Sequence, residues 1–110
     1  MHALAVAAIA LTGLHGTVVK GPTTPVCRAG RPCTAPAQVT LVFRRTAGAT
    51  RVYRVRTSVA GAYRVALPAG YYTVTTVERV GIGRSLRPQR VHVRAGHDDA
   101  LDFRIDTGLR

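Results

Sequence analysis

The chain has few aromatic residues, few acidic residues and a single lysine. The first shortage limits how a core can be built, and the second leaves the chain strongly basic. It has no tryptophan, four tyrosines and two phenylalanines in 110 residues, so a core must be built mostly from valine, alanine and leucine. Only Lys20 is a lysine, so nearly all 16 cations are arginines, and five acidic residues leave a net charge of +11. Such a charge attracts polyanions, namely nucleic acid, anionic lipid or an acidic cell-wall polymer. The alternative is a solvated basic surface without a dedicated partner.

Long hydrophobic runs are also absent. The longest apolar segment, residues 1–12 (MHALAVAAIALT), is too short to span a bilayer as a helix. It is typical of the apolar region of a secretory signal peptide with a cleavage point near Thr12, although only His2 precedes it where basic residues are usual. The alternative is a buried first strand or helix. We therefore expect residues 1–12 to be a signal-peptide remnant and residues 13–110 to form one domain. The protein is then expected to be secreted or to lie in the periplasm or cell envelope.

Both cysteines lie in one stretch, GPTTPVCRAGRPC (21–33), whose three prolines and two glycines exclude a helix and disfavour a strand. Cys27 and Cys33 are six positions apart, and Gly30 and Pro32 between them permit a tight reversal, so a disulfide is expected. It would hold a loop that has no ladder of hydrogen bonds. A metal site lacks further ligands nearby, and a redox dithiol would favour the spacing Cys-x-x-Cys. An oxidised pair also fits an exported protein.

After residue 13 the sequence consists of strand-like segments separated by turn signals, with almost no helical periodicity. The segments are short and evenly spaced, and they are rich in valine and threonine, which favour pleated, half-buried surfaces. Seven strands are expected, at residues 13–20, 37–45, 51–57, 62–67, 71–78, 89–94 and 100–106. This pattern predicts an all-β fold, a seven-stranded antiparallel sandwich of two sheets with a small core.

Two hairpins are predicted from the alternation of side chains. If residues 51–57 and 62–67 turn their apolar faces to one core, Thr57 lies opposite Tyr63. Residues 59–61 then form a three-residue loop in which Gly61 takes the left-handed conformation. Residues 89–94 and 100–106 form the second hairpin. The residues expected to face inward are Val39, Leu41, Phe43, Tyr53, Val55, Thr57, Tyr63, Val65, Leu67, Tyr72, Val74, Val91, Val93, Leu101, Phe103 and Ile105.

The first predicted hairpin brings arginines together on its outer face. In its register Arg56 and Arg64 are directly opposed, and Arg54 lies two residues along. Opposed like charges are destabilising unless the side chains splay into water or an anion bridges them, so Arg54, Arg56 and Arg64 are candidate anion-binding residues. A second cluster borders the second hairpin and consists of Arg84, Arg87, Arg90 and Arg94. Neither cluster is interleaved with exposed aromatic residues, so base stacking and a nucleic-acid partner are not expected.

No catalytic or metal-binding motif accompanies these features. The side chains that could bind a metal are His15, His92, His97, Asp98, Asp99 and Asp102. They form no HExxH or similar zinc motif, and the turn-forming tendency of polar residues accounts for the run at 97–99. Ser58 and Ser85 lie in or beside turns and outside any GxSxG sequence. We therefore expect no catalysis, no cofactor and no metal. A hydrolase would require a polar cleft around His97.

The stretch TSVAGAYRVALPAGYYTV (57–74) resembles the signature of the carboxypeptidase regulatory-like domains, which share a transthyretin-like (prealbumin-like) sandwich. The matching positions are Gly61, Tyr63, Val65, Leu67, Pro68, Gly70, Tyr72 and Val74. The segments GLHGTVVKGPTTPVC and VHVRAGHDDALDFRIDTGLR resemble small secreted bacterial members, so the resemblance extends over residues 13–110. The commonest form of the signature has an acidic residue or asparagine near position 60, where this chain has Ala60.

The resemblance implies a Greek-key-type, transthyretin-like sandwich and a non-enzymatic role, because such domains serve as accessory, adhesive or structural modules. We therefore expect an exported, non-catalytic module with a structural or binding role at the cell envelope. Its partner would be an envelope protein or an acidic polymer. The alternative is a polyanion-binding protein that uses an arginine-rich sheet face.

Overall fold

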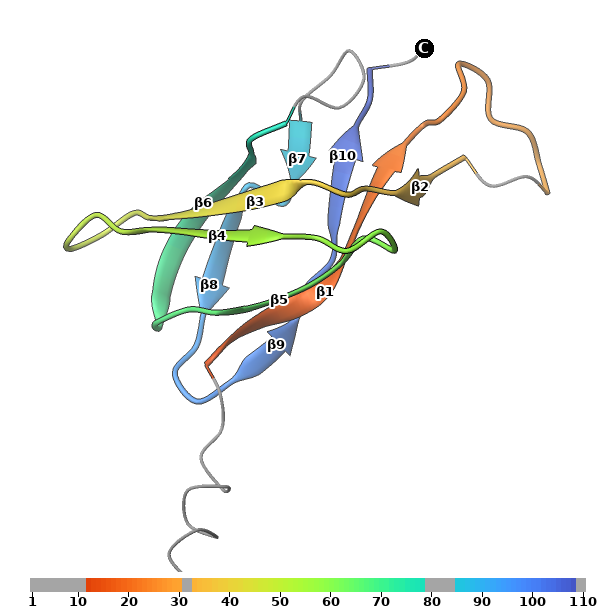
Figure 1. The fold of residues 1–110 in the computed structure, drawn as a ribbon. Coiled ribbons are helices and arrows are strands. Elements are labelled where there is room, and N and C mark those ends of the chain that lie inside the picture. The colour runs from red at the N-terminus through yellow and green to blue at the C-terminus, as the bar shows by residue number, and fades with distance from the viewer. Residues whose placement is uncertain (1–11, 31–32, 79–84, 109–110) are drawn as a thin grey trace, which may run out of the picture.

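The computed structural model describes residues 12–30, 33–78 and 85–108, and within these ranges the chain forms strands and no helix (Figure 1). The prediction of an all-β fold is therefore confirmed. All of the expected leader except Thr12 lies outside the described residues, as does Arg84. In the described part of the chain, no helix is long and apolar enough to cross a bilayer.

Ten strands form in the described ranges, where the sequence predicted seven. They are β1 (Gly13–Gly21), β2 (Ala35–Pro36), β3 (Thr40–Arg45), β4 (Val52–Arg56), β5 (Ala62–Ala66), β6 (Gly70–Thr76), β7 (Ser85–Arg87), β8 (Arg90–Val93), β9 (Asp98–Ala100) and β10 (Phe103–Asp106). The strand expected at 100–106 is broken at Leu101 and Asp102, so β9 and β10 take its place. The unexpected strands β2, β7 and β9 have only two or three residues, which is too short for an alternating pattern to be visible.

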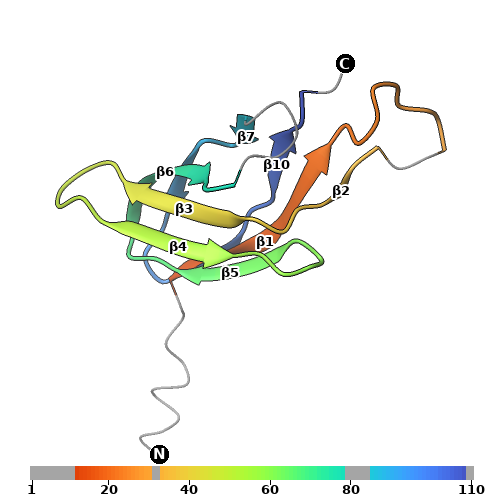
Figure 2. The same ribbon diagram turned by 45° about the horizontal axis from the view of Figure 1, so that its top comes forward.

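The strands form two sheets with the core between them (Figures 1 and 2). The four-stranded sheet is antiparallel, in the order β4-β3-β6-β8. The second sheet is built around the long strand β1, whose first half pairs with β5 and β9 and whose second half pairs with β2 and β10. Because β9 and β10 run parallel to β1, this sheet is mixed. The expectation of an entirely antiparallel sandwich is therefore wrong for the second sheet.

The first predicted hairpin does not form. β4 pairs with β3, and β5 pairs with β1, so the chain passes from one sheet to the other between them. The tight turn is present: Gly61 donates its N–H to the Ser58 carbonyl at 2.8 Å, and Gly61 has the predicted positive φ of 81°. The apolar faces still meet one core, because two strands can share an interior across a sandwich as well as side by side.

The second predicted hairpin fails in the same way. β8 pairs with β6 in the four-stranded sheet, while β9 and β10 pair with β1 in the mixed sheet. A turn in which His97 donates its N–H to the Arg94 carbonyl at 3.1 Å carries the chain across. Both errors thus have one cause, because side-chain alternation fixes which face of a strand is buried and leaves its neighbours undetermined.

Apolar side chains from both sheets form the core. Its buried residues are Leu14, Val18, Ala37, Val39, Leu41, Phe43, Tyr63, Leu67, Tyr72, Val74, Leu86, Val91, Val93, Phe103 and Ile105. The partly buried residues packed against it are Tyr53, Val55, Val65 and Leu101. Thr57 is buried as well, so every residue predicted to face inward does so. Phe103 of β10 lies edge-on to Phe43 of β3, with 6.2 Å between ring centroids, and thereby links the two sheets.

The cysteine loop leaves the sandwich between β1 and β2 (Figures 1 and 2). Cys27 and Cys33 form a disulfide with 5.6 Å between their Cα atoms, which confirms the predicted bond. At the base of the loop, Thr23 donates its N–H to the Cys33 carbonyl at 2.9 Å. Residues 23–30 are exposed, so the loop has no part in the core and the disulfide constrains it instead.

Candidate functional site: the basic face of the four-stranded sheet

The three arginines proposed to bind an anion do not share one sheet, although Arg56 and Arg64 line a common open pocket of about 590 Å³. Arg54 and Arg56 lie on β4, on the outer face of the four-stranded sheet, because Tyr53 and Val55, which alternate with them, face the core. Arg64 lies on β5 in the other sheet and forms an ion pair with Asp98. The opposed register of Arg56 and Arg64 is therefore wrong, and the reason is the missing hairpin.

The second arginine cluster is dispersed too. Arg87 lies on β7 in the mixed sheet, directly opposite Arg104. Arg94 follows β8 and pairs with Asp99, with 2.8 Å between its Nη2 and Oδ1. Of the cluster's described members, only Arg90, on the outer face of β8, joins the surface that carries Arg54 and Arg56.

That surface is the basic face, which we define as Arg44, Arg54, Arg56 and Arg90 on the outside of the four-stranded sheet. The pairing sets their arrangement: Arg54 is opposite Val42, and Arg44 is opposite Thr73, which in turn is opposite Arg90. With strands about 4.8 Å apart, the backbones of Arg44 and Arg90 are separated by about 10 Å across β6. Four guanidinium groups from three strands thus project from one side of the sheet.

Acidic residues are concentrated on the other sheet. Of the five carboxylates, Asp98, Asp99, Asp102 and Asp106 lie on or between β9 and β10. Among the described residues, Arg44, Arg54 and Arg90 form no ion pair. The positive charge of the basic face is therefore largely uncompensated, which favours the approach of an anion.

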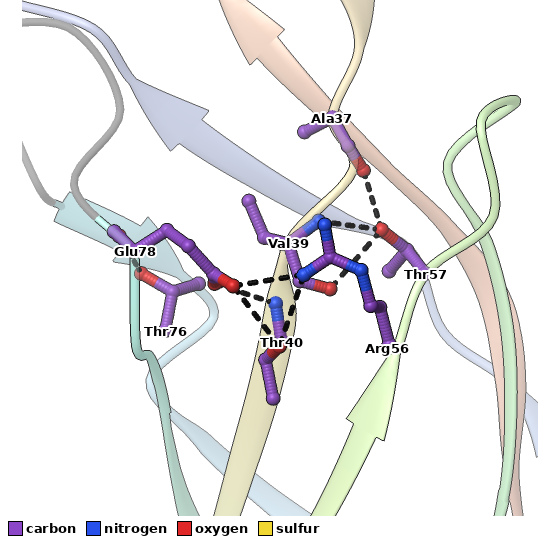
Figure 3. A network of polar contacts seen from close by, with 7 residues as sticks. All are labelled: Ala37, Val39, Thr40, Arg56, Thr57, Thr76 and Glu78. Atoms are coloured by element: carbon purple, nitrogen blue, oxygen red, sulfur yellow. Dashed lines mark hydrogen bonds and ion pairs between the residues drawn. The ribbon is translucent and has the colours of Figure 1, made fainter.

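Glu78 is the one acidic residue at the edge of this face (Figure 3). Its Oε1 accepts the N–H of Thr40 at 2.7 Å, and its Oε2 accepts from Arg56 at 2.9 Å and from the Thr40 hydroxyl at 3.0 Å. The Thr40 amide is the main reason that the pKa of Glu78 is lowered; burial opposes it, and the Thr40 and Arg56 side chains lower it further. Glu78 thus secures the end of β6 against β3, while the Arg56 side chain stays 56% exposed.

Replacing Glu78 with glutamine should remove part of the acid dependence of stability. The pKa of Glu78 is lower in the folded chain than its ordinary value of 4.5. Its contribution is therefore complete above that value and is lost as the pH falls through the folded pKa. We expect the wild type to exceed E78Q in unfolding free energy by under about 1 kcal/mol at pH 7, because water screens a carboxylate that is 37% exposed.

The measurement is urea unfolding of both proteins between pH 7 and pH 3, and the difference between them should shrink toward the acid end. R56Q is the matched control. Because the Thr40 amide contributes more than Arg56 to the lowered pKa, R56Q should retain most of the pH dependence that E78Q loses. Parallel curves for the wild type and E78Q would contradict the assignment.

An exposed aromatic pair, which was not predicted from the sequence, adjoins the arginines. Tyr71 of β6 and His92 of β8 are paired residues whose rings stack with 4.1 Å between centroids and 5° between planes. The Tyr71 side chain is 60% exposed. Its outward direction could have been inferred, because Tyr72 was predicted to face inward, but its meeting with His92 depends on the pairing of β6 with β8.

An open cleft of about 520 Å³ lies beside the same part of the sheet. It forms where the chain before β8 turns away to the mixed sheet, so that the far end of β6 has no neighbour from β8. Its lining comprises Thr73, Val74, Thr75, Thr76, Leu86, Gln89 and Arg90. Arg90 therefore belongs both to the basic face and to a cleft that offers threonine hydroxyls and a glutamine amide.

Several of the residues considered for metal or acid–base chemistry have other partners. His15 Nδ1 lies 3.0 Å from Asp98 Oδ1, and Asp98 also pairs with Arg64. The pKa of Asp98 is lowered, mainly by the hydrogen bond with His15. Ser58 Oγ accepts the N–H of Ala62 at 3.1 Å within a turn. In the described ranges, no three histidine, cysteine or acidic side chains converge as metal ligands would.

The residues behind the family resemblance occupy positions that suit a two-sheet sandwich. Tyr63, Leu67 and Tyr72 are buried, and the Tyr72 hydroxyl donates to the Pro68 carbonyl at 2.6 Å across the turn before β6. These observations concern the architecture of the fold alone. No family model, no curated protein and no solved structure matches this chain.

Proposed function

We propose that this chain is a non-catalytic β-sandwich module that binds an acidic polymer through its basic face. The observation that carries the proposal is the set of three arginines, Arg44, Arg54 and Arg90, that share one sheet surface without an ion pair among the described residues. Like charges held on neighbouring strands repel one another, and a bound polyanion relieves this repulsion. Guanidinium groups suit this role because each offers several donors in a fixed plane to carboxylate, sulfate or phosphate.

We also propose that the module works outside the cytoplasm, as a secreted, periplasmic or envelope protein. The Cys27–Cys33 disulfide supports this setting, because such bonds persist in oxidising compartments, and the apolar residues 1–12 support it as a leader. The motif at 57–74 supports membership of the carboxypeptidase regulatory-like domains with their transthyretin-like topology. An acidic polymer of the envelope is then the nearest ligand for the basic face.

The test is the salt dependence of binding to long-chain polyphosphate, which carries charge and no ring. The variant R44Q/R90Q removes two arginines from the basic face, and R87Q/R104Q removes two from the mixed sheet. Both variants lower the net charge from +11 by two, so they differ only in where the charge is lost. We expect R44Q/R90Q to weaken binding at least tenfold and to reduce the slope of log K against log salt by about 1 to 2.

For R87Q/R104Q, the slope of log K against log salt should differ from the wild-type slope by less than about 0.5. Equal losses in the two variants would mean that only net charge matters, and a larger loss in R87Q/R104Q would move the site to the mixed sheet. Either result, or failure of the wild type to bind polyphosphate, would contradict the proposed site.

A further inference from the structure

We infer that the polymer bound by the basic face is an acidic polysaccharide, one of whose sugar rings packs against Tyr71 of the Tyr71–His92 pair. The inference rests on the proposed function and adds the class of ligand to it. Three features support this assignment: the exposure of Tyr71, its distance from the arginines and the hydroxyl groups between them.

Tyr71 is the exception among the aromatic residues of this chain. Its exposed fraction is 60%, whereas the other five aromatic residues are buried in the core or packed against it. Stacking on His92 holds the ring in place on the sheet surface, so a ligand would meet a side chain whose freedom is already reduced. An ordered, exposed ring of this kind is a typical contact residue of a binding surface.

The aromatic pair and the arginines form adjacent rows on the same face. Tyr71 is two residues from Thr73, and His92 is two residues from Arg90, so the rows are separated by about 7 Å along the strands. In the arginine row, Thr73 lies between Arg44 and Arg90. A ligand that spans both rows therefore meets an aromatic ring, hydroxyl groups and guanidinium groups in succession.

A polymer of acidic sugars combines the groups that this surface can bind. The C–H face of a pyranose ring is apolar and packs on the flat side of an aromatic ring, which removes both from water. Its carboxylate or sulfate accepts charge-assisted hydrogen bonds from arginine. Its hydroxyl groups exchange hydrogen bonds with Thr73, Thr75 and Gln89, which line the cleft beside Arg90.

A single-stranded nucleic acid fits the surface less well. Sequence-independent binding of a strand stacks successive bases on several exposed aromatic side chains, and here Tyr71 is the single aromatic residue with a largely exposed side chain. The disulfide also indicates an oxidising compartment. Base stacking was not expected from the sequence because no exposed aromatic residue was foreseen among the arginines. Tyr71 is such a residue, so the experiment includes a nucleic acid.

The experiment compares three probes: polygalacturonate, which has both rings and charge, polyphosphate, which has charge alone, and an oligo(dT) strand. Binding is measured for the wild type, Y71A and Y71F, with folding verified by circular dichroism. Y71A should weaken binding of polygalacturonate about tenfold, which corresponds to one aromatic contact, and change binding of polyphosphate less than twofold. Y71F keeps the ring and should bind polygalacturonate within about twofold of the wild type.

The outcomes distinguish a failure of the polysaccharide inference from a failure of the proposed function. If Y71A weakens both acidic polymers equally, or neither, the sugar ring is not recognised and the inference fails, while binding to the basic face stands. If Y71A reduces binding of oligo(dT) more than that of polygalacturonate, the pair binds bases and the polysaccharide assignment is overturned. If the wild type binds none of the probes, the proposed function fails as well.

Discussion

Replacing Phe103 with alanine should lower the free energy of unfolding by about 3 to 5 kcal/mol. Phe103 is 1% exposed, and its ring lies 6.2 Å from that of Phe43 and 5.6 Å from that of Tyr63, measured between centroids. Phe43 belongs to the four-stranded sheet, and Phe103 and Tyr63 belong to the mixed sheet. The substitution therefore opens a cavity at the contact between the sheets, where neither can close it alone. A loss of this size is a large fraction of the stability of a small domain.

The measurement is urea unfolding followed by far-ultraviolet circular dichroism, since the chain has no tryptophan to report by fluorescence. F103L is the matched control, because leucine fills much of the space; its loss should be clearly smaller, about 1 to 2 kcal/mol. If F103A costs under about 1.5 kcal/mol, the ring does not join the sheets as described.

Replacing Thr57 with valine should cost about 2 to 4 kcal/mol, although the two side chains have nearly the same shape. The Thr57 hydroxyl donates to the Ala37 carbonyl at 2.6 Å and accepts the N–H of Val39 at 2.8 Å (Figure 3). Thr57 is 2% exposed, so water cannot take the place of the hydroxyl. Valine would leave a buried carbonyl and a buried N–H without these bonds, each at a cost of about 1 to 3 kcal/mol.

The controls are T57S and T75V, measured by the same unfolding experiment. Serine keeps the hydroxyl and loses one methyl group, so T57S should cost about 1 kcal/mol. Thr75 is exposed on the outer face, and T75V should change stability by less than about 0.5 kcal/mol. A cost of T57V no greater than that of T75V would show that the bonds of Thr57 do not stabilise the fold.

The sequence allowed us to predict which side chains of each strand face the core. It did not allow us to predict which strands pair with one another. Tyr53 and Val55 were expected to face the same interior as Tyr63 and Val65, and they do. The alternation that placed them is equally satisfied by a hairpin within one sheet and by a crossing between two sheets. The turn gave no help, because a left-handed Gly61 suits both connections. In the crossing, a Cβ at Gly61 would also lie 2.5 Å from the Val18 carbonyl oxygen, a constraint that appears only once β1 is in place.

The candidate site illustrates the same limit. His92 lies between two buried residues, and Arg44, Arg90 and Tyr71 are each next to one, so their outward direction follows from the sequence. They share a surface because the order of the sheet is β4-β3-β6-β8, which brings together strands that are distant in the chain. The predicted hairpin placed Arg64 beside Arg56 and Arg54, and it left Arg44 outside the predicted cluster. To predict this surface, one would have to know which strands pair, and the composition of the chain does not contain that information.

The parallel pairing of β1 with β10 has a consequence for how the protein is made. Val18 lies beside Phe103 in that pair, and at its edge the Thr17 N–H bonds to Asp102, 85 residues further along the chain. On the ribosome, β1 must wait for this partner until residue 106 has been synthesised, so the mixed sheet cannot be completed while the earlier strands emerge. Contacts so distant in sequence place folding on a timescale of roughly milliseconds to seconds. Throughout that interval the polypeptide remains open, which would suit the export proposed for this module.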